Sequence, residues 1–195
     1  MRIFFVTGNE AKFHEASLVL REFGVDLVID REHKKIEIQS DNLEDIVSNA
    51  LGEICSSNVT NYFVVEDDGL FINRLNGFPG PYSAYVYKTI GLTGILKLMS
   101  GVEDRSAYFK SVVGLCGPKI NIKLFTGIVR GSIAMEPRGS EGFGFDPIFI
   151  PDGYDKTFAE LGIDIKNKLS HRARAFRSLG TWLLGNFQTI NLNHY

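Results

Sequence analysis

The chain has little cysteine: only Cys55 and Cys116 occur among its 195 residues. Their separation does not match the close spacing of paired metal ligands, so a cysteine-based metal site is excluded. Cys55 lies in a helical pattern and Cys116 in a strand pattern. We therefore expect two buried free thiols.

Long hydrophobic runs are also absent. No run approaches the ~20 apolar residues that span a membrane. The apolar start of the chain, residues 3–6, is too short for a signal peptide. We expect a cytoplasmic protein that binds no membrane.

The sequence has no excess of one charge, since 21 lysines and arginines face 23 acidic residues and the net charge is -2. A broad basic face for nucleic acid is therefore not expected, although a local basic pocket remains possible. The hydrophobic share of 44% is ordinary for a globular protein. The length predicts a single domain over residues 1–195.

The most informative stretch is residues 62–70, YFVVEDDGL. Its apolar first half predicts a buried strand that ends at the acidic triplet Glu66, Asp67 and Asp68, with a second strand over residues 70–72. Clustered carboxylates repel one another unless a cation lies between them, and their hard oxygen atoms suit magnesium. Taken alone, however, such a triplet is more typical of a solvated turn.

The N-terminal segment predicts an anion site. Residues 2–7 read as a buried strand, residues 7–9 as a turn, and residues 10–23 as an amphipathic helix. The free N–H groups and the positive end of the helix dipole would face whatever lies at this turn. Lys12 adds a positive charge in the first helical turn. The pattern lacks the glycines and the Lys-Ser/Thr pair of a Walker motif.

The remaining elements follow from apolar periodicity and turn signals. Glu37 lies between two isoleucines, which places it on the solvent side of a short strand. We expect strands over residues 26–30, 35–38, 107–116 and 120–130, the last two forming a hairpin, and helices over residues 43–57, 91–101, 156–161 and 170–184, with a Gly- and Pro-rich loop over residues 76–84.

A second informative stretch is residues 139–151, in which glycines alternate with Phe143 and Phe145 before Asp146. Glycine allows close approach of the backbone to a ligand, and aromatic faces stack on bases. Two core phenylalanines beside a bulge are an equally good interpretation. In the last helix, Ser170 predicts an N-cap, and Arg172 in the first turn opposes the helix dipole unless a ligand compensates it.

Six motifs occur in one order along the chain. They are Thr7-Gly8-Asn9-x-x-Lys12, Glu66-Asp67-Asp68-Gly69-Leu70, Phe78-Pro79-Gly80-x-Tyr82-Ser83, Gly142-Phe143-Gly144-Phe145-Asp146-Pro147, Lys156-Thr157-Phe158-Ala159-Glu160 and Ser170-His171-Arg172. Together they resemble the inosine triphosphate pyrophosphatase family, which hydrolyses non-standard purine nucleoside triphosphates.

The resemblance implies an α/β fold with an elongated mixed β-sheet, flanking helices and two lobes around a central substrate cleft. It implies a homodimer and magnesium-dependent hydrolysis of ITP, dITP and XTP to the monophosphate and pyrophosphate. Carried over residue by residue, it makes Asp67 the proton acceptor, and Glu37 and Asp67 the magnesium ligands. The residues implied to bind substrate are Thr7, Gly8, Asn9, Lys12, Asp68, Phe143, Gly144, Phe145, Asp146, Lys166, His171 and Arg172.

Three positions depart from the family pattern. Asp68 stands where a small hydroxyl residue is common, Phe145 replaces a tyrosine, and Glu53 stands where many relatives have a lysine near the triphosphate. Two of these changes add negative charge beside a polyanion. We therefore hypothesise a greater demand for magnesium.

Two other functions remain open on the sequence. One is a related pyrophosphatase of the septum-inhibitor type, which acts on pyrimidine or modified nucleotides. The other is a nucleotide-binding regulator without catalysis, which would have no need of both Glu37 and Asp67. The His171-Arg172 pair favours a purine, because arginine can donate to the C6 oxygen and N7 of a 6-keto base.

Overall fold

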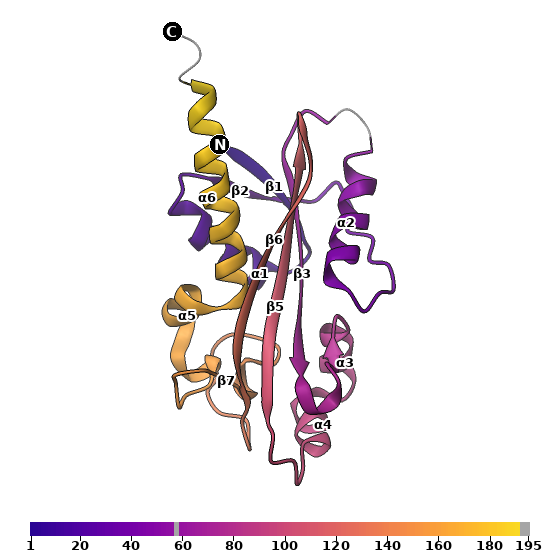
Figure 1. The fold of residues 1–195 in the computed structure, drawn as a ribbon, viewed down its shortest axis with the longest axis vertical. Helices are drawn as coiled ribbons and strands as arrows, with labels where there is room; N and C mark the ends of the chain where they lie inside the picture. Colours follow the sequence, from indigo (N-terminus) through magenta and orange to yellow (C-terminus); the bar gives the residue numbers. More distant parts are fainter. Residues whose placement is uncertain (57–58, 192–195) are drawn as a thin grey trace.

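A mixed seven-stranded sheet runs the length of an elongated molecule (Figure 1). The computed structural model describes residues 1–56 and 59–191. The elements are β1 Arg2–Val6, α1 Glu10–Arg21, β2 Asp26–Asp30, α2 Leu43–Ile54, β3 Phe63–Ile72, β4 Pro79–Gly80, α3 Ser83–Thr89, α4 Gly91–Leu98, β5 Ser106–Gly117, β6 Ile120–Ile133, β7 Phe149–Pro151, α5 Phe158–Leu169 and α6 His171–Asn191, with short 3-10 helices at Asn73–Leu75 and Asp146–Ile148.

The strands follow the order β2-β1-β3-β5-β6-β7, and β4 pairs with β3. β1 is parallel to β2 and to β3, whereas the other pairs are antiparallel. The predicted hairpin of β5 and β6 is present, and its two strands run along the long axis of the molecule (Figure 1). The prediction of an α/β fold with an elongated mixed sheet and flanking helices is confirmed.

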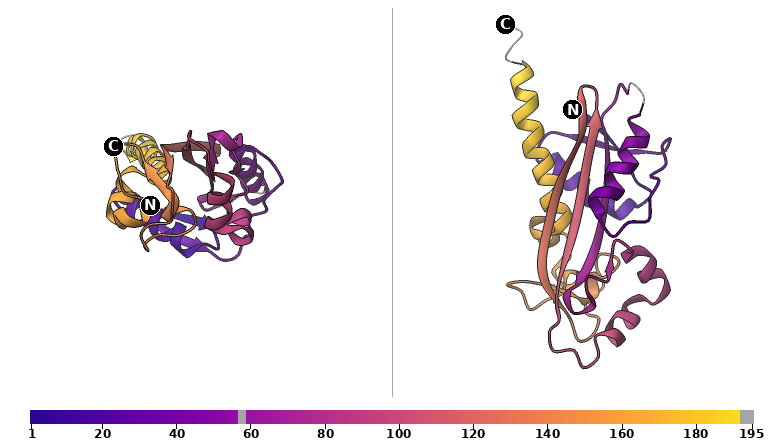
Figure 2. Two further views of the ribbon diagram at one scale, coloured as in Figure 1. Left: turned by 90° about the horizontal axis from the view of Figure 1, so that it is seen from below. Right: turned by 45° about the vertical axis from the view of Figure 1, so that its right-hand side comes forward.

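Helices cover both faces of the sheet, as the two views of Figure 2 show. Alternation along the strands explains this arrangement, because successive side chains point to opposite faces. Val64 of β3 and Val113 of β5 pack in one core cluster with residues of α1 and α6. Val65 and Val112 pack in another cluster with residues of α2. A third cluster, around Phe109, Phe149 and Phe158, fills the half of the molecule that contains α3, α4, β7 and α5.

The acidic triplet lies inside a strand, so the prediction of a strand end at Glu66 is wrong. β3 continues to Ile72 because β5 pairs with it over the whole length, with Glu66 opposite Val113 and Asp68 opposite Ser111. β1 reaches only as far as the pair Phe5–Val64. The carboxylates therefore lie just beyond the carboxyl end of β1, where the sheet is open on one side.

Several other boundaries differ from the predictions. Residues 35–38 form no strand, and Ile36 and Ile38 are exposed because no neighbouring strand covers them. Part of the predicted loop over residues 76–84 belongs to α3. α2 ends at Ile54, and the predicted end at Ser57 lies outside the described residues.

Among the helices of the described ranges, none combines the length and the apolar character that a membrane span requires.

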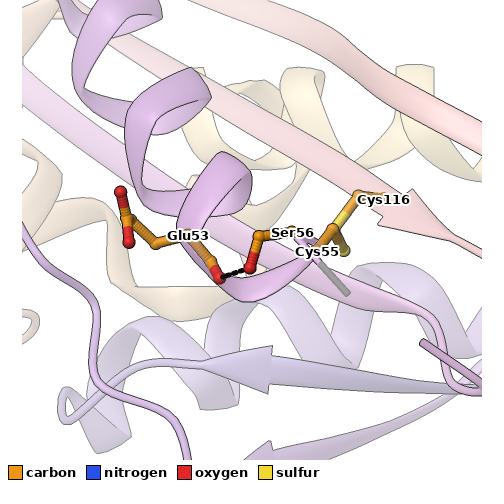
Figure 3. The surroundings of a disulfide bond; sticks show 4 residues. All are labelled: Glu53, Cys55, Ser56 and Cys116. Carbon is orange, nitrogen blue, oxygen red and sulfur yellow. Dashed lines mark hydrogen bonds between the residues drawn. A yellow bond between two sulfur atoms is a disulfide. The ribbon is translucent and has the colours of Figure 1, made fainter. Parts of the chain in front are cut away.

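Cys55 and Cys116 form a disulfide, so the prediction of two free thiols is wrong (Figure 3). Cys116 points to the face of β5 that α2 covers, and Cys55 follows the last turn of α2. Packing thus brings together two residues that are 61 positions apart, with 6.5 Å between their Cα atoms. Sequence spacing alone carries no information on this proximity.

Candidate functional site

A cavity of about 890 Å³ lies where the loop after β1, the open side of β3, α3 and the start of α6 meet. This cavity brings together every residue that the sequence predicted for the site. Its predicted lining residues are Thr7, Gly8, Asn9, Lys12, Glu37, Asp67, Asp68, Phe143, Gly144, Phe145, Asp146, Lys166, His171 and Arg172.

The turn between β1 and α1 has the expected form of a helix N-terminus. The side-chain oxygen of Asn9 accepts a hydrogen bond from the Lys12 backbone N–H at 3.0 Å, and Thr7 Oγ1 accepts from the Asn9 N–H at 3.1 Å. Gly8 borders open space, so its backbone is accessible to a ligand. The positive end of α1 therefore faces the cavity, as an anion site requires.

Strand alternation divides the acidic triplet between two groups of cations. Glu66 and Asp68 point to the face covered by α1 and α6, and both carboxylates contact the ammonium of Lys12. Asp67 points to the opposite face, where its Oδ1 lies 2.9 Å from the Nζ of Lys35. The three acids thus have different partners although they are consecutive in the sequence.

The two predicted magnesium ligands converge on one cation. Lys35 Nζ lies 2.7 Å from Glu37 Oε1 and 2.9 Å from Asp67 Oδ1. Over the described residues, no group of three or more His, Cys, Asp or Glu side chains could hold a metal ion. Two carboxylates completed by phosphate oxygens and water are, however, a common magnesium site. The positions of Glu37 and Asp67 therefore fit a pair of ligands for one cation, such as Mg²⁺.

Arg172 is the centre of a buried network of charges. Its Nε donates to Glu66 Oε1 at 3.1 Å, and its two terminal nitrogens donate to Glu15 Oε2 at 2.5 Å and Asp68 Oδ2 at 2.9 Å. Glu15 also holds Lys166, with 2.7 Å between Oε1 and Nζ. The Arg172 side chain is fully buried and forms part of the cavity lining. Three of its five N–H donors bind carboxylates, which fixes the direction of the other two.

The loop before α5 forms the aromatic wall of the cavity. Asp146 organises it, because its Oδ2 accepts hydrogen bonds from the Phe143 N–H at 2.9 Å and from Lys166 Nζ at 2.6 Å. Gly142 has a φ of +78°, and a Cβ there would collide with the Asp146 carboxylate. Lys166 Nζ lies 4.5 Å from the centre of the Phe143 ring, and Phe145 packs edge-on against Tyr87.

The environment gives Asp67 and Asp68 different proton affinities. Burial raises the pKa of Asp67 above its ordinary value, although the Lys35 ammonium partly offsets this effect. Burial acts in the same direction on Asp68, but the Lys12 and Arg172 cations outweigh it and hold the pKa of Asp68 well below its ordinary value. Asp67 is therefore the better proton acceptor of the two.

His171 lines the same cavity, and its environment disfavours the protonated ring. Burial lowers its pKa, and the hydrogen bond to Asp68 opposes this effect only in part. Its Nε2 lies 3.2 Å from Asp68 Oδ2, and its ring stacks on Phe109. In a neutral ring that donates through Nε2, Nδ1 is an acceptor. That atom is buried and has no partner among the described residues.

The sequence interpretation did not assign Glu15 or Lys35 to the site, and it gave Glu66 no role beyond its place in the acidic triplet. The signal for Glu15 was a charged residue beside Ala16 on the apolar face of a helix. The signal for Lys35 was its position two residues before Glu37, which places both side chains on one side of an extended segment. Neither signal identifies the partner, because each partner comes from a distant part of the chain.

Glu53 does not belong to the site. It is exposed on α2, it is not part of the cavity lining, and its backbone oxygen accepts a hydrogen bond from Ser56 (Figure 3). The expectation that it adds negative charge beside a bound polyanion is therefore wrong. Asp68 does line the cavity, but two cations already compensate its charge.

The chain is similar to known proteins over nearly its whole length. The profile of the Ham1 family matches residues 3–182. The chain belongs to the Ham1 family. Among the relatives of this Ham1 protein, the dITP/XTP pyrophosphatase of Methanopyrus kandleri is 51% identical over 187 residues, which are 95% of this chain and 98% of the relative. The protein of the same name from Pyrococcus horikoshii is 50% identical and covered completely, over 96% of this chain.

Two solved structures have the same fold. The Staphylococcus aureus Ham1 protein superposes with a TM-score of 0.79 at 28% identity, over 95% of this chain and 99% of that one. The nucleoside-triphosphatase/dITP/XTP pyrophosphatase of Mycobacterium abscessus gives a TM-score of 0.71 at 34% identity, over 92% and 98%. The family resemblance predicted from the six motifs is confirmed.

Proposed function

We propose that this Ham1 protein hydrolyses non-standard purine nucleoside triphosphates (ITP, dITP and XTP) to the monophosphate and pyrophosphate with the help of Mg²⁺. One observation carries the proposal. A single cavity combines a carboxylate pair that shares a cation, Glu37 and Asp67, with an anion site at Lys12 and an aromatic wall at Phe143. The names of the relatives, dITP/XTP pyrophosphatase, agree with this chemistry.

In the proposed reaction, a water oxygen forms a bond to the α-phosphorus while the bond to the pyrophosphate oxygen breaks. Asp67 accepts the proton of the water, a role that suits a carboxyl with a raised pKa. The start of α1 and the Lys12 ammonium lie beside the leaving pyrophosphate and compensate its charge. Lys12 must then exchange at least part of its contact with Glu66 and Asp68 for phosphate oxygens.

Glu37 and Asp67 would hold the magnesium ion. When bound, the ion neutralises phosphate charge and favours a nucleophilic water. Apart from the local effect of Lys12 and the start of α1, the side chains of the cavity supply no net positive charge, because its charged lining residues are equal in number for the two signs. The cations are Lys12, Arg31, Lys34, Lys35, Lys88, Lys166 and Arg172, and the anions are Glu10, Asp30, Glu37, Glu66, Asp67, Asp68 and Asp146.

The proposed selectivity for 6-keto purines rests on hydrogen-bond polarity. Arg172 can offer its two remaining N–H groups to the C6 oxygen and N7 of hypoxanthine or xanthine. The Nδ1 acceptor of neutral His171 can serve an N–H of the same base. Adenine presents an amino donor at C6, so it would leave a donor facing a donor. A buried site of this kind discriminates strongly.

We also propose a cytoplasmic homodimer in which each chain is one domain with two lobes around the cleft. The support is the family resemblance together with the placement of the cavity between elements from both halves of the chain. Analytical ultracentrifugation tests the dimer. A monomer at micromolar concentration would contradict it without affecting the proposed reaction.

The decisive experiment is a substrate panel. Purified protein is incubated with Mg²⁺ and ITP, XTP, dITP, GTP or ATP, and pyrophosphate and orthophosphate are measured separately. We expect pyrophosphate from ITP, XTP and dITP and little from GTP or ATP. The variant Asp67→Asn should lose the activity, whereas Asp45→Asn, at an exposed carboxylate of α2, should retain it.

Other results would favour the alternative functions. Pyrophosphate from pyrimidine or modified nucleotides would indicate the septum-inhibitor type of pyrophosphatase. Nucleotide binding without turnover would indicate a regulator. Orthophosphate as the only product would contradict attack at the α-phosphorus.

A further inference from the structure

Lys35 comes from a segment that otherwise faces solvent. The neighbouring Lys34 and Ile36 are exposed, yet the side chain of Lys35 is only 14% exposed. Residues 31–42 form no helix or strand, so no regular element forces the side chain inward. The inward direction is instead explained by the two carboxylates that Lys35 contacts.

The ammonium lies between the same two carboxylates that we propose as magnesium ligands. Its distances to Glu37 Oε1 and Asp67 Oδ1 are 2.7 Å and 2.9 Å. An ammonium and a divalent cation cannot occupy one position between two carboxylates. Entry of a metal ion at this position therefore requires that the Lys35 ammonium leave it.

Without a cation, these carboxylates would repel each other at close range in a partly buried place. The side chain of Asp67 is 11% exposed and that of Glu37 is 58% exposed. An ammonium removes this repulsion and keeps both oxygen atoms directed at one point. The arrangement holds the ligand pair aligned while no metal is bound.

We propose that Lys35 is an internal counter-ion that occupies the metal position of the nucleotide-free enzyme and is displaced when Mg²⁺ enters. This inference rests on the proposed function, since it takes Glu37 and Asp67 as the metal ligands. Lys35 also lines the cavity, so the displaced ammonium remains close to the phosphates of a bound nucleotide. The free enzyme thus takes up metal weakly, and the metal–nucleotide complex is the favoured ligand.

The test is a titration with Mn²⁺ in the absence of nucleotide, followed by the electron paramagnetic resonance of free Mn²⁺. Wild type is compared with Lys35→Met, and Lys34→Met is the matched control. Lys34 lines the same cavity but has no ion pair in the described structure. The Lys35 bridge is intermediate between an exposed and a buried ion pair, so its loss should tighten Mn²⁺ binding about tenfold. The control should change the dissociation constant less than twofold.

Thermal unfolding provides a second readout that does not depend on activity. Without metal, Lys35→Met should unfold at a lower temperature than wild type, because its carboxylates are uncompensated. Saturating Mg²⁺ should raise the midpoint of the variant more than that of wild type. Lys35→Gln, which keeps a polar side chain, should behave in the same way if the charge is the cause.

Three outcomes would overturn the inference: unchanged or weaker Mn²⁺ binding by Lys35→Met, an equal gain in Lys34→Met, or no Mn²⁺ binding by either wild type or Lys35→Met. None of these depends on turnover. The proposed function is judged separately, by pyrophosphate release from ITP and XTP, so the two can fail independently.

Discussion

Glu15 offers a quantitative test of the buried charge network. Its carboxylate bridges Arg172 and Lys166, and all three side chains are at most 3% exposed. The variant Glu15→Gln keeps the size of the side chain and removes its charge. Arg172 then retains Glu66 and Asp68, and Lys166 retains Asp146.

The expected loss of unfolding free energy in Glu15→Gln follows from the burial of the ion pairs. Removal of one partner from a buried ion pair typically costs about 3–5 kcal/mol, because the remaining charge is left without compensation. Both cations keep other carboxylates here, so we expect the low end, about 3 kcal/mol of unfolding free energy. For a chain of this length, the midpoint of thermal unfolding would fall by roughly 6–12 °C.

Urea denaturation near pH 7, together with thermal unfolding, measures the change. Glu10→Gln is the control on the same helix, because Glu10 is 71% exposed and its partner Arg31 is 77% exposed. Such exposed pairs contribute about 0–1 kcal/mol. A loss of less than about 1 kcal/mol in Glu15→Gln, or an equal loss in the control, would refute the argument.

Acid pH gives an independent check on the same pair of proteins. Burial acts to raise the pKa of Glu15, but Arg172 and Lys166 outweigh it and lower the pKa below its ordinary value of 4.5. The folded protein therefore keeps this carboxylate ionised at pH values where the unfolded chain binds a proton. This stabilisation is present above the unfolded pKa and is lost as the pH falls through the lower folded pKa. The difference between wild type and Glu15→Gln should shrink over that range, and a gap that widens in acid would contradict the assigned partners.

Three further outcomes are expected. Because burial raises the pKa of Asp67, kcat/KM should fall as the pH drops through that raised pKa. The variant Asp67→Asn should lose roughly 10²–10⁴-fold in rate. If the residual activity of the variant shows the same fall in acid, another group causes that fall. Loss of the disulfide should lower the unfolding free energy by roughly 4 kcal/mol, because the unfolded chain is then no longer constrained by the loop that the bond closes. Urea denaturation measures this change after reduction, or in the double variant Cys55→Ser with Cys116→Ser. Equal midpoints before and after reduction would contradict the prediction. Glu53→Lys should leave kcat, KM and the magnesium dependence unchanged, since the side chain lies outside the cavity, and an altered KM for ITP would show otherwise.

Local chemistry explains why part of this structure was predictable. The β1–α1 turn, the start of α1 and the hairpin of β5 and β6 depend on neighbouring residues, so periodicity and turn signals were sufficient. The residues of the cavity were predicted from motifs whose order and spacing match a known family. That information comes from the resemblance, because no single motif specified its partner in space.

The remaining features depend on contacts between distant segments, which only the tertiary structure determines. β3 continues through its three acids because β5 pairs with it, although the sequence there indicates a turn. The disulfide forms because α2 packs on one face of β5. Pairing of Glu15 with Arg172 and of Lys35 with Asp67 spans 157 and 32 positions.

The order of the amino acids thus specifies which positions carry the charges, the aromatic rings and the turns. Folding determined which charge meets which, because the alternation of β3 directs Glu66 and Asp68 to one face of the sheet and Asp67 to the other. The adjacent carboxylates of Asp67 and Asp68 consequently have pKa shifts in opposite directions. Burial and the distance to a counter-charge set these properties, and both arise only when the segments pack together.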